Sequence, residues 1–466
     1  MTVEAPPREP LDLFPDGDGY RRLLKGRSRK AQYFKLACLV SLTLAVVALA
    51  TLLYTIINDS FGLVAVVNEN EPDALLASLG YDPAQTSLED LSQEELVGLL
   101  QASVTSGVGR RLERDQRFFA DRLAFESEAT WAEICASDEP PTGCTMAPRD
   151  QANILQLVYE RVVVPDIIAT NELVPSLLKP QAFNDEIAAG FESGRFPEYS
   201  PEQVSIEWRA WFNPTFLRSP ASATAETAGI RTAILGSLWL VVITILFALP
   251  VGVGAAIYLV EYARPTRVND IIQTNINNLA GVPSIVYGML GLAIFVRALE
   301  PLTSGSLFAS NPADNGRTLI AAGLTLGILT LPVVIISAQE ALKAVPDSLR
   351  QAGLALGATR WQTVRSQILP VALPGILTGA ILAVARAIGE TAPLILVGAA
   401  GFITADPTGP FSKFTALPIQ IFQWTSLPQE EFRNLAAAAS IALLILLLTL
   451  NAVAVILRNR FSRRVE

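Results

Sequence analysis

The residues in this sequence best suited to chemistry are an arginine and a glutamate inside a long apolar run. The run reads PGILTGAILAVARAIGETAPLILVGAAGF and contains Arg386 and Glu390, with Thr391 directly after them. On a helix the pair is four residues apart, so both side chains lie on one face and can form an ion pair. A guanidinium is always charged and presents a planar fork that matches phosphate oxygens. The pair is therefore either a structural ion pair or part of a site for an anion.

The surroundings of this pair follow from the composition of the chain. It has 466 residues, of which 51% are hydrophobic and 17% charged, whereas about a quarter of a soluble domain is charged. The apolar residues gather in runs that are long enough to cross a bilayer. The composition therefore predicts a multi-pass membrane protein.

Several classes of function are disfavoured by what the sequence lacks. There is no histidine, which removes the Ser-His-Asp and Cys-His nucleophile systems and histidine-based metal sites, so we expect no catalytic residue and no metal. The net charge of −9 argues against nucleic acid as a partner. No phosphate-binding loop of the G-x-x-x-x-G-K-[ST] type is present, so we expect no cofactor, and any ATP must be bound by another chain.

Six apolar runs predict six transmembrane helices, which would return both termini to one side of the membrane. Residues 1–33 form a basic tail. The apolar run 34–57 is too long for a signal peptide, so we expect a retained first helix with its basic side, and hence both termini, in the cytoplasm. The other five spans are expected at 232–258, 276–295, 319–337, 373–399 and 435–457, within a core of residues 229–466.

Residues 58–228 form a long acidic insertion between the first and second helices. From 59 to 227 it holds 28 Asp and Glu against 11 Lys and Arg, a net charge of −17. Amphipathic pieces such as LEDLSQEELVGLLQASV indicate a mainly helical insertion, and the orientation of the first helix places it outside the cytoplasm. Cys135 and Cys144 lie here, in an oxidising compartment. They form either a small disulfide-closed loop, which we favour, or two free thiols.

The fifth span carries the Arg–Glu pair deep into the bilayer. Arg386 lies 13 residues beyond Leu373, about 20 Å into a hydrocarbon core of about 30 Å. A lone charge at this depth costs roughly 2.5–3.5 kcal/mol, so both side chains must face protein or water. Beside them, small residues recur every four positions and predict helix packing rather than substrate handling. They are Gly375, Gly379, Ala383 and Ala387.

The inner loop between spans four and five, residues 339–370, reads as a helix, a glycine break and a second helix. Gly357 supplies the break, and the second amphipathic helix is expected over 358–368. Such a unit is suited to docking into a groove on a partner protein. It equally fits an interfacial helix that lies on lipid with its basic residues towards the headgroups.

A resemblance decides between these two interpretations. The pattern Q-A-G-x-x-x-G at 351–357, followed by I-L-P at 368–370, resembles the EAA motif of ABC-transporter permeases. In that family the loop rests on the ATP-hydrolysing subunit and transmits its closure. The motif's glutamate is Gln351 here and its second alanine is Gly353. The resemblance assigns ATPase coupling to Gln351, Ala352, Gly353, Gly357, Ile368 and Pro370.

Three longer segments narrow the resemblance to the A-type permease of phosphate-specific ABC importers. They are AIYLVEYARP at 256–265, NLAGVPSIVYGMLGLAIFV at 278–296 and ARAIGETAPLILVG at 385–398. The implied fold is an all-α integral membrane protein of the bacterial inner membrane, with six transmembrane helices of the MetI-like importer permease type. The implied partners are a homologous permease, two ATP-binding subunits, an extracytoplasmic phosphate-binding protein and membrane lipid.

The same resemblance favours a phosphate site at Arg386, with Glu390 keeping phosphate binding weak enough for release. Thr391, together with Ser284 and Tyr287 of the third span, completes the expected substrate path. Two alternatives stay open. One is a permease for sulfate or molybdate, and the other is a membrane receptor that senses ligand through residues 58–228. The short cytoplasmic segments argue against the receptor, because they leave no room for a kinase or cyclase as its output.

Overall fold

The structure is a computed structural model that describes residues 18–103, 151–197, 199–222, 224–306, 316–399, 403 and 406–462. The chain divides after Ile56 into two compact units. Within the described residues, five helices are long and apolar enough to cross a membrane, or six if one sharply bent pair forms a single span.

The described part of the first unit is residues 18–56 of helix α1 (Asp18–Asp59), whose last turn belongs to the second unit. The part Ala31–Asp59 of this helix has the length and hydropathy of a membrane span. The hydroxyls of Ser41, Thr43 and Thr51 each donate to the carbonyl four residues earlier in the helix. Polar side chains satisfied in this way can lie in hydrocarbon without a partner chain.

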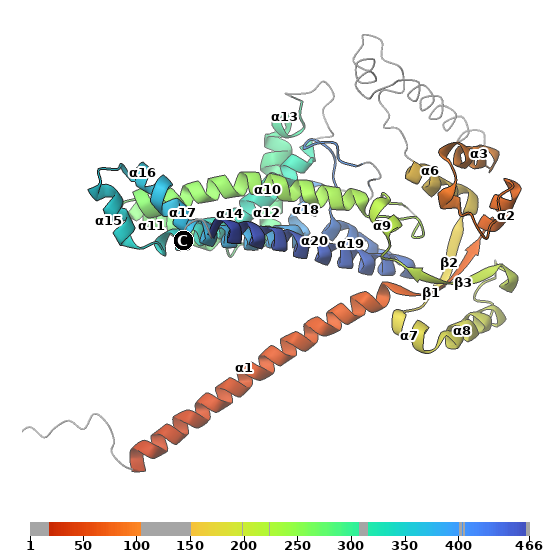
Figure 1. Cartoon of the computed structure of the whole chain (residues 1–466), viewed down its shortest axis with the longest axis horizontal. Helices are drawn as coiled ribbons and strands as arrows, with labels where there is room; N and C mark the ends of the chain where they lie inside the picture. Colours follow the sequence, from red (N-terminus) through yellow and green to blue (C-terminus); the bar gives the residue numbers. More distant parts are fainter. Residues whose placement is uncertain are drawn as a thin grey trace, which may run out of the picture. The chain divides into compact units, whose positions relative to one another are not determined.

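The second unit contains long helices that pack along one another: α10 (Arg231–Ile257), α14 (Leu319–Lys343), α17 (Leu369–Gly389) and α20 (Glu430–Ser462) (Figure 1). Helix α14 is the central one, since it packs against both α10 and α17 and is mostly buried. Glycines set its distance from α10, because a Cβ on Gly323 would lie 2.5 Å from Ile243 and one on Gly327 would lie 2.5 Å from Phe247.

The third predicted span, 276–295, is not one straight helix. It consists of α11 (Arg267–Leu279) and α12 (Ser284–Gly291), and the pair is bent by 105°. Pro283 precedes α12 with extended backbone (ψ 136°), and its ring disfavours a helical conformation in the residue before it. The bend was not predicted, because membrane helices tolerate proline and Pro283 alone does not mark a break. The π-helical turn η5 (Leu292–Ala298) and the short α13 (Glu300–Thr303) follow.

The fifth predicted span, 373–399, also breaks. Helix α17 ends at Gly389, Glu390 is extended (φ −80°, ψ 119°), and a separate helix α18 (Ala392–Val397) follows. Pro393 explains the break, because it has no backbone N–H to donate to the carbonyl of Gly389 and its ring clashes with that carbonyl in a continuous helix. The Arg–Glu pair thus lies at the end of a helix rather than in its middle.

The inner loop contains two short helices, α15 (Asp347–Ala355) and α16 (Arg360–Thr363), and α16 continues through the π-helical turn η7 (Val364–Ile368) into α17. The second helix expected over 358–368 is therefore α-helical for one turn and π-helical for the next. Buried side chains of this segment, Val364 and Ile368, pack against Ile257 at the end of α10 and Leu342 at the end of α14. The loop is thus anchored to the bundle.

The insertion contains a three-stranded antiparallel sheet that the sequence analysis does not predict. Its strands are β1 (Phe61–Asn68), β2 (Pro165–Thr170) and β3 (Val204–Ala210), in the order β2-β1-β3. β1 begins two residues after α1, so its apolar sequence FGLVAVV was hidden behind the apolar run of the first span. Within β1, Val64 pairs with Thr170 on one side and Glu207 on the other.

The sheet shares a hydrophobic core with the helix ends that lie far from the inner loop (Figure 1). Val64, Val66 and Ile167 of the sheet pack in one cluster with Trp424 and Phe432. These come from α19 (Leu417–Ser426) and from α20, and α9 (Pro214–Arg218) adds Phe216. The sheet therefore belongs to the same folded unit as the bundle.

A second, separate core lies between β1 and β2 in the sequence. Its buried side chains include Leu76, Leu96 and Val158, and it shares no buried residue with the first core. It is built by α2 (Pro72–Ser78), η1 (Leu88–Asp90), α3 (Gln93–Ser103), α6 (Gln151–Val158) and η2 (Tyr159–Val163). After β2 come α7 (Leu173–Leu178), α8 (Pro180–Glu192) and η3 (Pro201–Gln203).

Candidate functional site

Arg386 and Glu390 form the ion pair that their spacing allows. Nε of Arg386 donates to Oε1 of Glu390 at 3.2 Å, and the two side chains are 43% and 18% exposed. Within the part of the chain that the structure describes, the Arg386 side chain makes this one hydrogen bond. Its two Nη groups therefore remain available to an anion on the exposed face of α17.

The break between α17 and α18 lies against α12. A Cβ on Gly288 of α12 would lie 2.6 Å from the Cα of Pro393, so only glycine permits this approach. Arg386 and Glu390 are thus in direct contact, and Tyr287, the residue before Gly288, lies within electrostatic range of Arg386.

The other predicted path residues have local roles in the backbone. The hydroxyl of Tyr287 donates to the carbonyl of Leu279 at 2.8 Å and so braces the bend between α11 and α12. Ser284 is the first residue of α12, about one turn before Tyr287. Thr391 precedes α18, where its carbonyl accepts from the N–H of Ile395 at 3.2 Å. Ser284 and Thr391 are both partly exposed.

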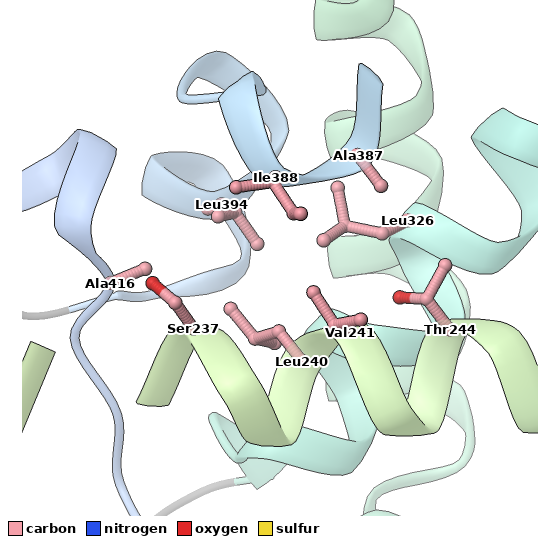
Figure 2. Close-up of a pocket in the computed structure, with 9 residues that line it drawn as sticks. All are labelled: Ser237, Leu240, Val241, Thr244, Leu326, Ala387, Ile388, Leu394 and Ala416. Atoms are coloured by element: carbon pink, nitrogen blue, oxygen red, sulfur yellow. The ribbon is translucent and has the colours of Figure 1, made fainter. Parts of the chain in front are cut away.

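A small cavity lies next to the break and is lined by residues on both sides of it (Figure 2). Side chains of α10, among them Leu240 and Val241, point across it towards Ala387, Ile388 and Leu394. It offers about 10 Å³ to the centre of a water molecule, which is room for about one water. The cavity is therefore too small and too apolar to hold a tetrahedral oxyanion.

The stripe of small residues on α17 faces α14 and the interior of the bundle. A Cβ on Gly379 would lie 2.1 Å from Cβ of Ser337, and one on Gly375 would lie 2.7 Å from Cβ of Ala341. Ala383 and Ala387, further along the stripe, are buried. Arg386 lies between Ala383 and Ala387 in the sequence, and its side chain is 43% exposed although both alanines are buried.

The predicted coupling residues fall into an exposed group and a buried group. Gln351, Ala352 and Gly357 are exposed, together with Leu356, which is 88% exposed. Gly357 has φ +83°, a left-handed conformation that a side chain with a Cβ disfavours, and it ends α15. The exposed group presents a polar and apolar surface that a partner can contact.

The remaining coupling residues hold the loop together. A Cβ on Gly353 would lie 2.8 Å from Cγ2 of Thr363, so the glycine lets α15 pack against α16. Ile368 is buried in the cluster beneath the loop, and Pro370 lies in the first turn of α17. Their positions are those of structural supports rather than contact residues.

Two residues that the sequence analysis did not single out fix this loop to the bundle. Arg350 of α15 donates from Nη2 to Oε1 of Glu261 at 2.9 Å and from Nε to the same oxygen at 3.1 Å. It also donates to the carbonyls of Leu342 and Val345 at 2.8 and 2.7 Å. Glu261 lies in the π-helical turn η4 (Tyr258–Tyr262) that follows α10. The hydrogen bond to Glu261 raises the pKa of Arg350.

A second polar site that sequence reasoning missed lies at the opposite end of the bundle. Arg209 of β3 stacks 4.7 Å from the ring centre of Trp211 and donates to the backbone carbonyl of Glu226 at 2.7 Å. The cavity beside them offers about 50 Å³ to water and is also lined by Asn213 and Thr215. Burial raises the pKa of the Glu226 carboxyl, and the nearby Glu431 and Asp166 raise it further, although Arg209 opposes them.

Two further predictions concern the cysteine pair and a metal site. Cys135 and Cys144 lie outside the described residues, so their pairing stays a prediction. Within the described ranges, no group of three or more cysteine, aspartate or glutamate side chains is arranged to hold a metal ion.

Comparison with known proteins gives the relatives of this chain. Residues 248–466 match the family described as the inner membrane component of binding-protein-dependent transport systems. That range includes the loop 339–370 and the Arg386–Glu390 pair.

Three curated proteins illustrate the similarity. The chain is 38% identical over 212 residues to the probable ABC transporter permease protein YqgI of Bacillus subtilis, covering 45% of this chain and 66% of that protein. It is 35% identical over 237 residues to the phosphate transport system permease protein PstA 1 of Mycobacterium tuberculosis (strain ATCC 25618 / H37Rv), covering 51% and 71%. To PstA of Yersinia pestis it is 34% identical over 227 residues, covering 48% and 71%.

Solved structures with a similar chain path include two importers. One chain of the inward-facing MetNI methionine ABC transporter is 20% identical, with a TM-score of 0.36, covering 51% of this chain and 97% of that chain. A bacterial ABC transporter involved in alginate import is 15% identical, with a TM-score of 0.40, covering 63% and 95%.

Proposed function

Because this chain belongs to the PstA family of ABC-transporter permeases, we propose that it forms part of the translocation path of an ATP-driven phosphate importer. Family membership confirms the predicted fold, a helical multi-pass membrane protein of the MetI-like permease type. In the proposed complex the path is shared with a homologous permease. Two ATP-binding subunits dock on the cytoplasmic side, and a phosphate-binding protein delivers the substrate from outside. Both termini of the chain then lie in the cytoplasm.

The observation that carries the proposal is the position of Arg386. Its side chain lies on an exposed part of the α17 surface, at 43% exposure in the single chain, although Ala383 and Ala387 on either side of it in the sequence are buried. A charge that far along a membrane span is unfavourable against lipid, so the face must meet protein or water. A second permease laid against this face would turn it into the wall of a shared path. The free Nη groups would then face an anion that enters there.

Glu390 and Tyr287 complete the proposed site. The carboxylate of Glu390 holds the guanidinium in place at 3.2 Å while the path is empty. It also repels a bound phosphate, which keeps binding weak enough for release. Tyr287 braces the bend between α11 and α12 through its hydrogen bond to Leu279, within electrostatic range of Arg386.

Coupling to ATP hydrolysis is proposed to run through α15 and α16. Leu356 and Trp361 are large exposed apolar side chains on this loop, and together with the polar Gln351 they suit a groove on an ATPase. Movement of α15 would be passed to α10 and α14 through Arg350, because its donors reach Glu261 and the carbonyl of Leu342. No ATP is proposed to bind to this chain itself.

The test is uptake of radiolabelled phosphate by the complete transporter in liposomes that contain ATP. We expect Arg386→Ala to lower the uptake rate by roughly tenfold or more, because a charge-assisted hydrogen bond contributes about 1.5–3 kcal/mol. Arg386→Lys should fall between the two, since it keeps the charge but loses the planar fork.

Arg460→Ala is the matched control, because it removes an exposed arginine near the end of α20. Its uptake should equal that of the wild type. Normal uptake by an assembled Arg386→Ala complex would overturn the proposed site.

The same preparation separates the alternatives. Unlabelled sulfate or molybdate should leave phosphate uptake unchanged if the site is for phosphate, and competition by either would favour the broader oxyanion permease. ATP hydrolysis stimulated by the phosphate-loaded binding protein without any uptake would instead favour a receptor.

A further inference from the structure

Helix α7 (Leu173–Leu178) carries two leucines that no part of the described chain covers. Leu177 is 64% exposed and Leu178 is 75% exposed. They are the most exposed large apolar side chains among the described residues of the insertion. The next residue, Lys179, is also exposed. An adjacent pair of exposed leucines in a strongly acidic segment needs a physical reason.

The backbone of α7 is tied to the end of the first membrane span. The N–H of Val174 donates to Oδ1 of Asn58 at 2.9 Å, and Nδ2 of Asn58 donates to the carboxylate of Glu172. Asn58 is buried and directly follows the apolar run 34–57. On the other side of α7, the buried hydroxyl of Ser176 accepts from the N–H of Leu63 at 2.9 Å. These bonds fix α7 on both sides.

The hydrogen bonds between α7 and Asn58 keep the two leucines close to the residue at which the apolar run 34–57 ends. Leu177 is three residues after Val174, so it lies about 5 Å further along the helix. The polar interfacial layer of a bilayer is about 5–8 Å thick on each side. Leu177 and Leu178 are therefore held within about one such layer thickness of Asn58, the residue that directly follows the apolar run 34–57.

The chemistry of the segment fits a lipid interface better than a protein partner. Leucine side chains suit the boundary between headgroups and acyl chains, and the ammonium of Lys179 can reach the lipid phosphates. Residues 59–227 carry a net charge of −17, which repels the insertion from an anionic bilayer. An apolar contact at the foot of the insertion opposes that repulsion.

We propose that Leu177 and Leu178 insert into the membrane interface close to Asn58, where the apolar run 34–57 ends, and hold the three-stranded sheet at a fixed height above the bilayer. The contact acts through Ser176 and Leu63, which join α7 to β1. The sheet in turn forms one core with the ends of α19 and α20. The lipid surface thereby becomes a third support for the insertion, next to the span and the bundle.

The experiment measures the depth of nitroxide labels on the full chain in lipid bilayers. Labels are placed at Leu177→Cys and Leu178→Cys, in a background in which Cys38, Cys135 and Cys144 are replaced by serine. The control label is Ser78→Cys, an exposed site on α2 in the separate core. Relaxation by oxygen, which concentrates in lipid, is compared with relaxation by a water-soluble nickel complex.

We expect the labels on α7 to be relaxed mainly by oxygen, and the control label mainly by the nickel complex. Equal access of the nickel complex to all three labels would overturn the proposal. Protection of the α7 labels from both reagents would also overturn it, because it would place protein rather than lipid over the two leucines. The side chains are exposed, so neither substitution removes a packing contact of the folded chain.

Discussion

At the scale of single residues, the Arg386–Glu390 pair has one property that an ordinary structural ion pair lacks. Only Nε of the arginine is engaged with Glu390 in the described chain, so the bidentate geometry that would saturate both groups is absent. A structural pair gains most from two parallel hydrogen bonds. The single bond leaves the two Nη groups of Arg386 unengaged by Glu390. This is expected of a guanidinium that releases one anion and binds another.

The arrangement of Arg386 and Glu390 predicts how Glu390→Gln changes phosphate binding. Removing the carboxylate charge should tighten phosphate binding roughly tenfold or more, because a charge several ångströms away in a partly buried site acts strongly. Release should slow, so the maximal uptake rate should fall together with the half-saturating concentration. Both are measured by phosphate uptake in the reconstituted transporter. Glu340→Gln, an exposed site at the end of α14, should change neither value.

A loss of assembly in Glu390→Gln, with no change in affinity, would contradict this prediction. It would assign the pair to helix orientation, as the sequence analysis allows. Arg386→Ala should then destabilise the chain to a similar extent. The anion-site hypothesis and the structural hypothesis therefore predict different phosphate affinities for Glu390→Gln, and not only different uptake rates.

Glu226 gives a prediction about pH. Its folded pKa is raised, chiefly by burial, above the ordinary value of 4.5, so the folded state binds this proton more tightly than the unfolded state. Stability from this group is therefore present below about pH 4.5 and is lost as pH rises through the folded pKa. Glu226→Gln removes this dependence. We expect the midpoint of thermal unfolding of the variant to rise relative to wild type as pH increases from 4.5.

The difference between variant and wild type isolates Glu226, because the other titrating groups are common to both. A constant difference across pH would show that the carboxyl titrates alike in the folded and unfolded chains. Glu207→Gln is a suitable control, since it neutralises an exposed glutamate on the same strand as Arg209.

At the scale of elements, the joint between α15 and α10 depends on Arg350 and Glu261. Their side chains are 19% and 10% exposed, and breaking a buried pair by removing one partner costs roughly 3 kcal/mol. Arg350→Met should therefore destabilise the chain strongly in thermal unfolding. Lys343→Met is the matched control, because its pair with Glu340 is exposed and such pairs contribute about 0–1 kcal/mol.

The double variant Arg350→Met with Glu261→Gln should recover part of this loss, because it no longer leaves a buried charge unpaired. In the assembled transporter, Arg350→Met should also raise ATP hydrolysis that is not accompanied by uptake. Additive losses in the double variant would show that the two side chains act independently.

The long membrane-spanning helices could be predicted because each corresponds to a continuous apolar run in the sequence. The spans at α10, α14 and α20 follow from this signal alone. The breaks at 280–283 and 390–391 were not predicted, because the hydropathy of a run does not show where a proline stops the helix. Pro283 and Pro393 were visible, yet membrane helices also tolerate proline, as Pro250 and Pro332 inside α10 and α14 show.

Spacing rules predict only those parts of the site whose residues are neighbours in the sequence, whereas Tyr287 was expected there from the family resemblance. Arg386 and Glu390 are four residues apart, so helical spacing was enough to pair them. Arg350 and Glu261 are 89 residues apart, and no spacing rule within one sequence connects them. The same holds for the strands β1 and β3, whose pairing joins Val64 to Glu207 across the whole insertion.

At the scale of the whole molecule, the insertion consists of two parts with different relations to the bundle. The sheet contributes Val64, Val66 and Ile167 to the core that also contains Trp424 of α19. The helices between β1 and β2 form their own core, with no buried residue in common with the first. A deletion that respects this division should be tolerated, and one that crosses it should not.

The register of the sheet shows where to cut. Asn68 at the end of β1 lies opposite Pro165 at the start of β2. Residues 69–164 can therefore be replaced by a two-residue Asn-Gly turn, which joins paired antiparallel strands with the correct twist. We expect this variant to fold, to unfold at nearly the wild-type temperature, and to take up phosphate at the wild-type rate.

Deletion of residues 62–200 is the contrasting variant, because it removes β2 and all but the first residue of β1. The core around Trp424 then loses Val64, Val66 and Ile167, each of which contributes roughly 1.5–3 kcal/mol by burial. We expect this variant to be lost from the membrane fraction or to unfold well below the wild type. If the turn variant folds but does not transport, the helices between β1 and β2 take part in transport itself. The separate core would then be a docking element for the partner that delivers the substrate.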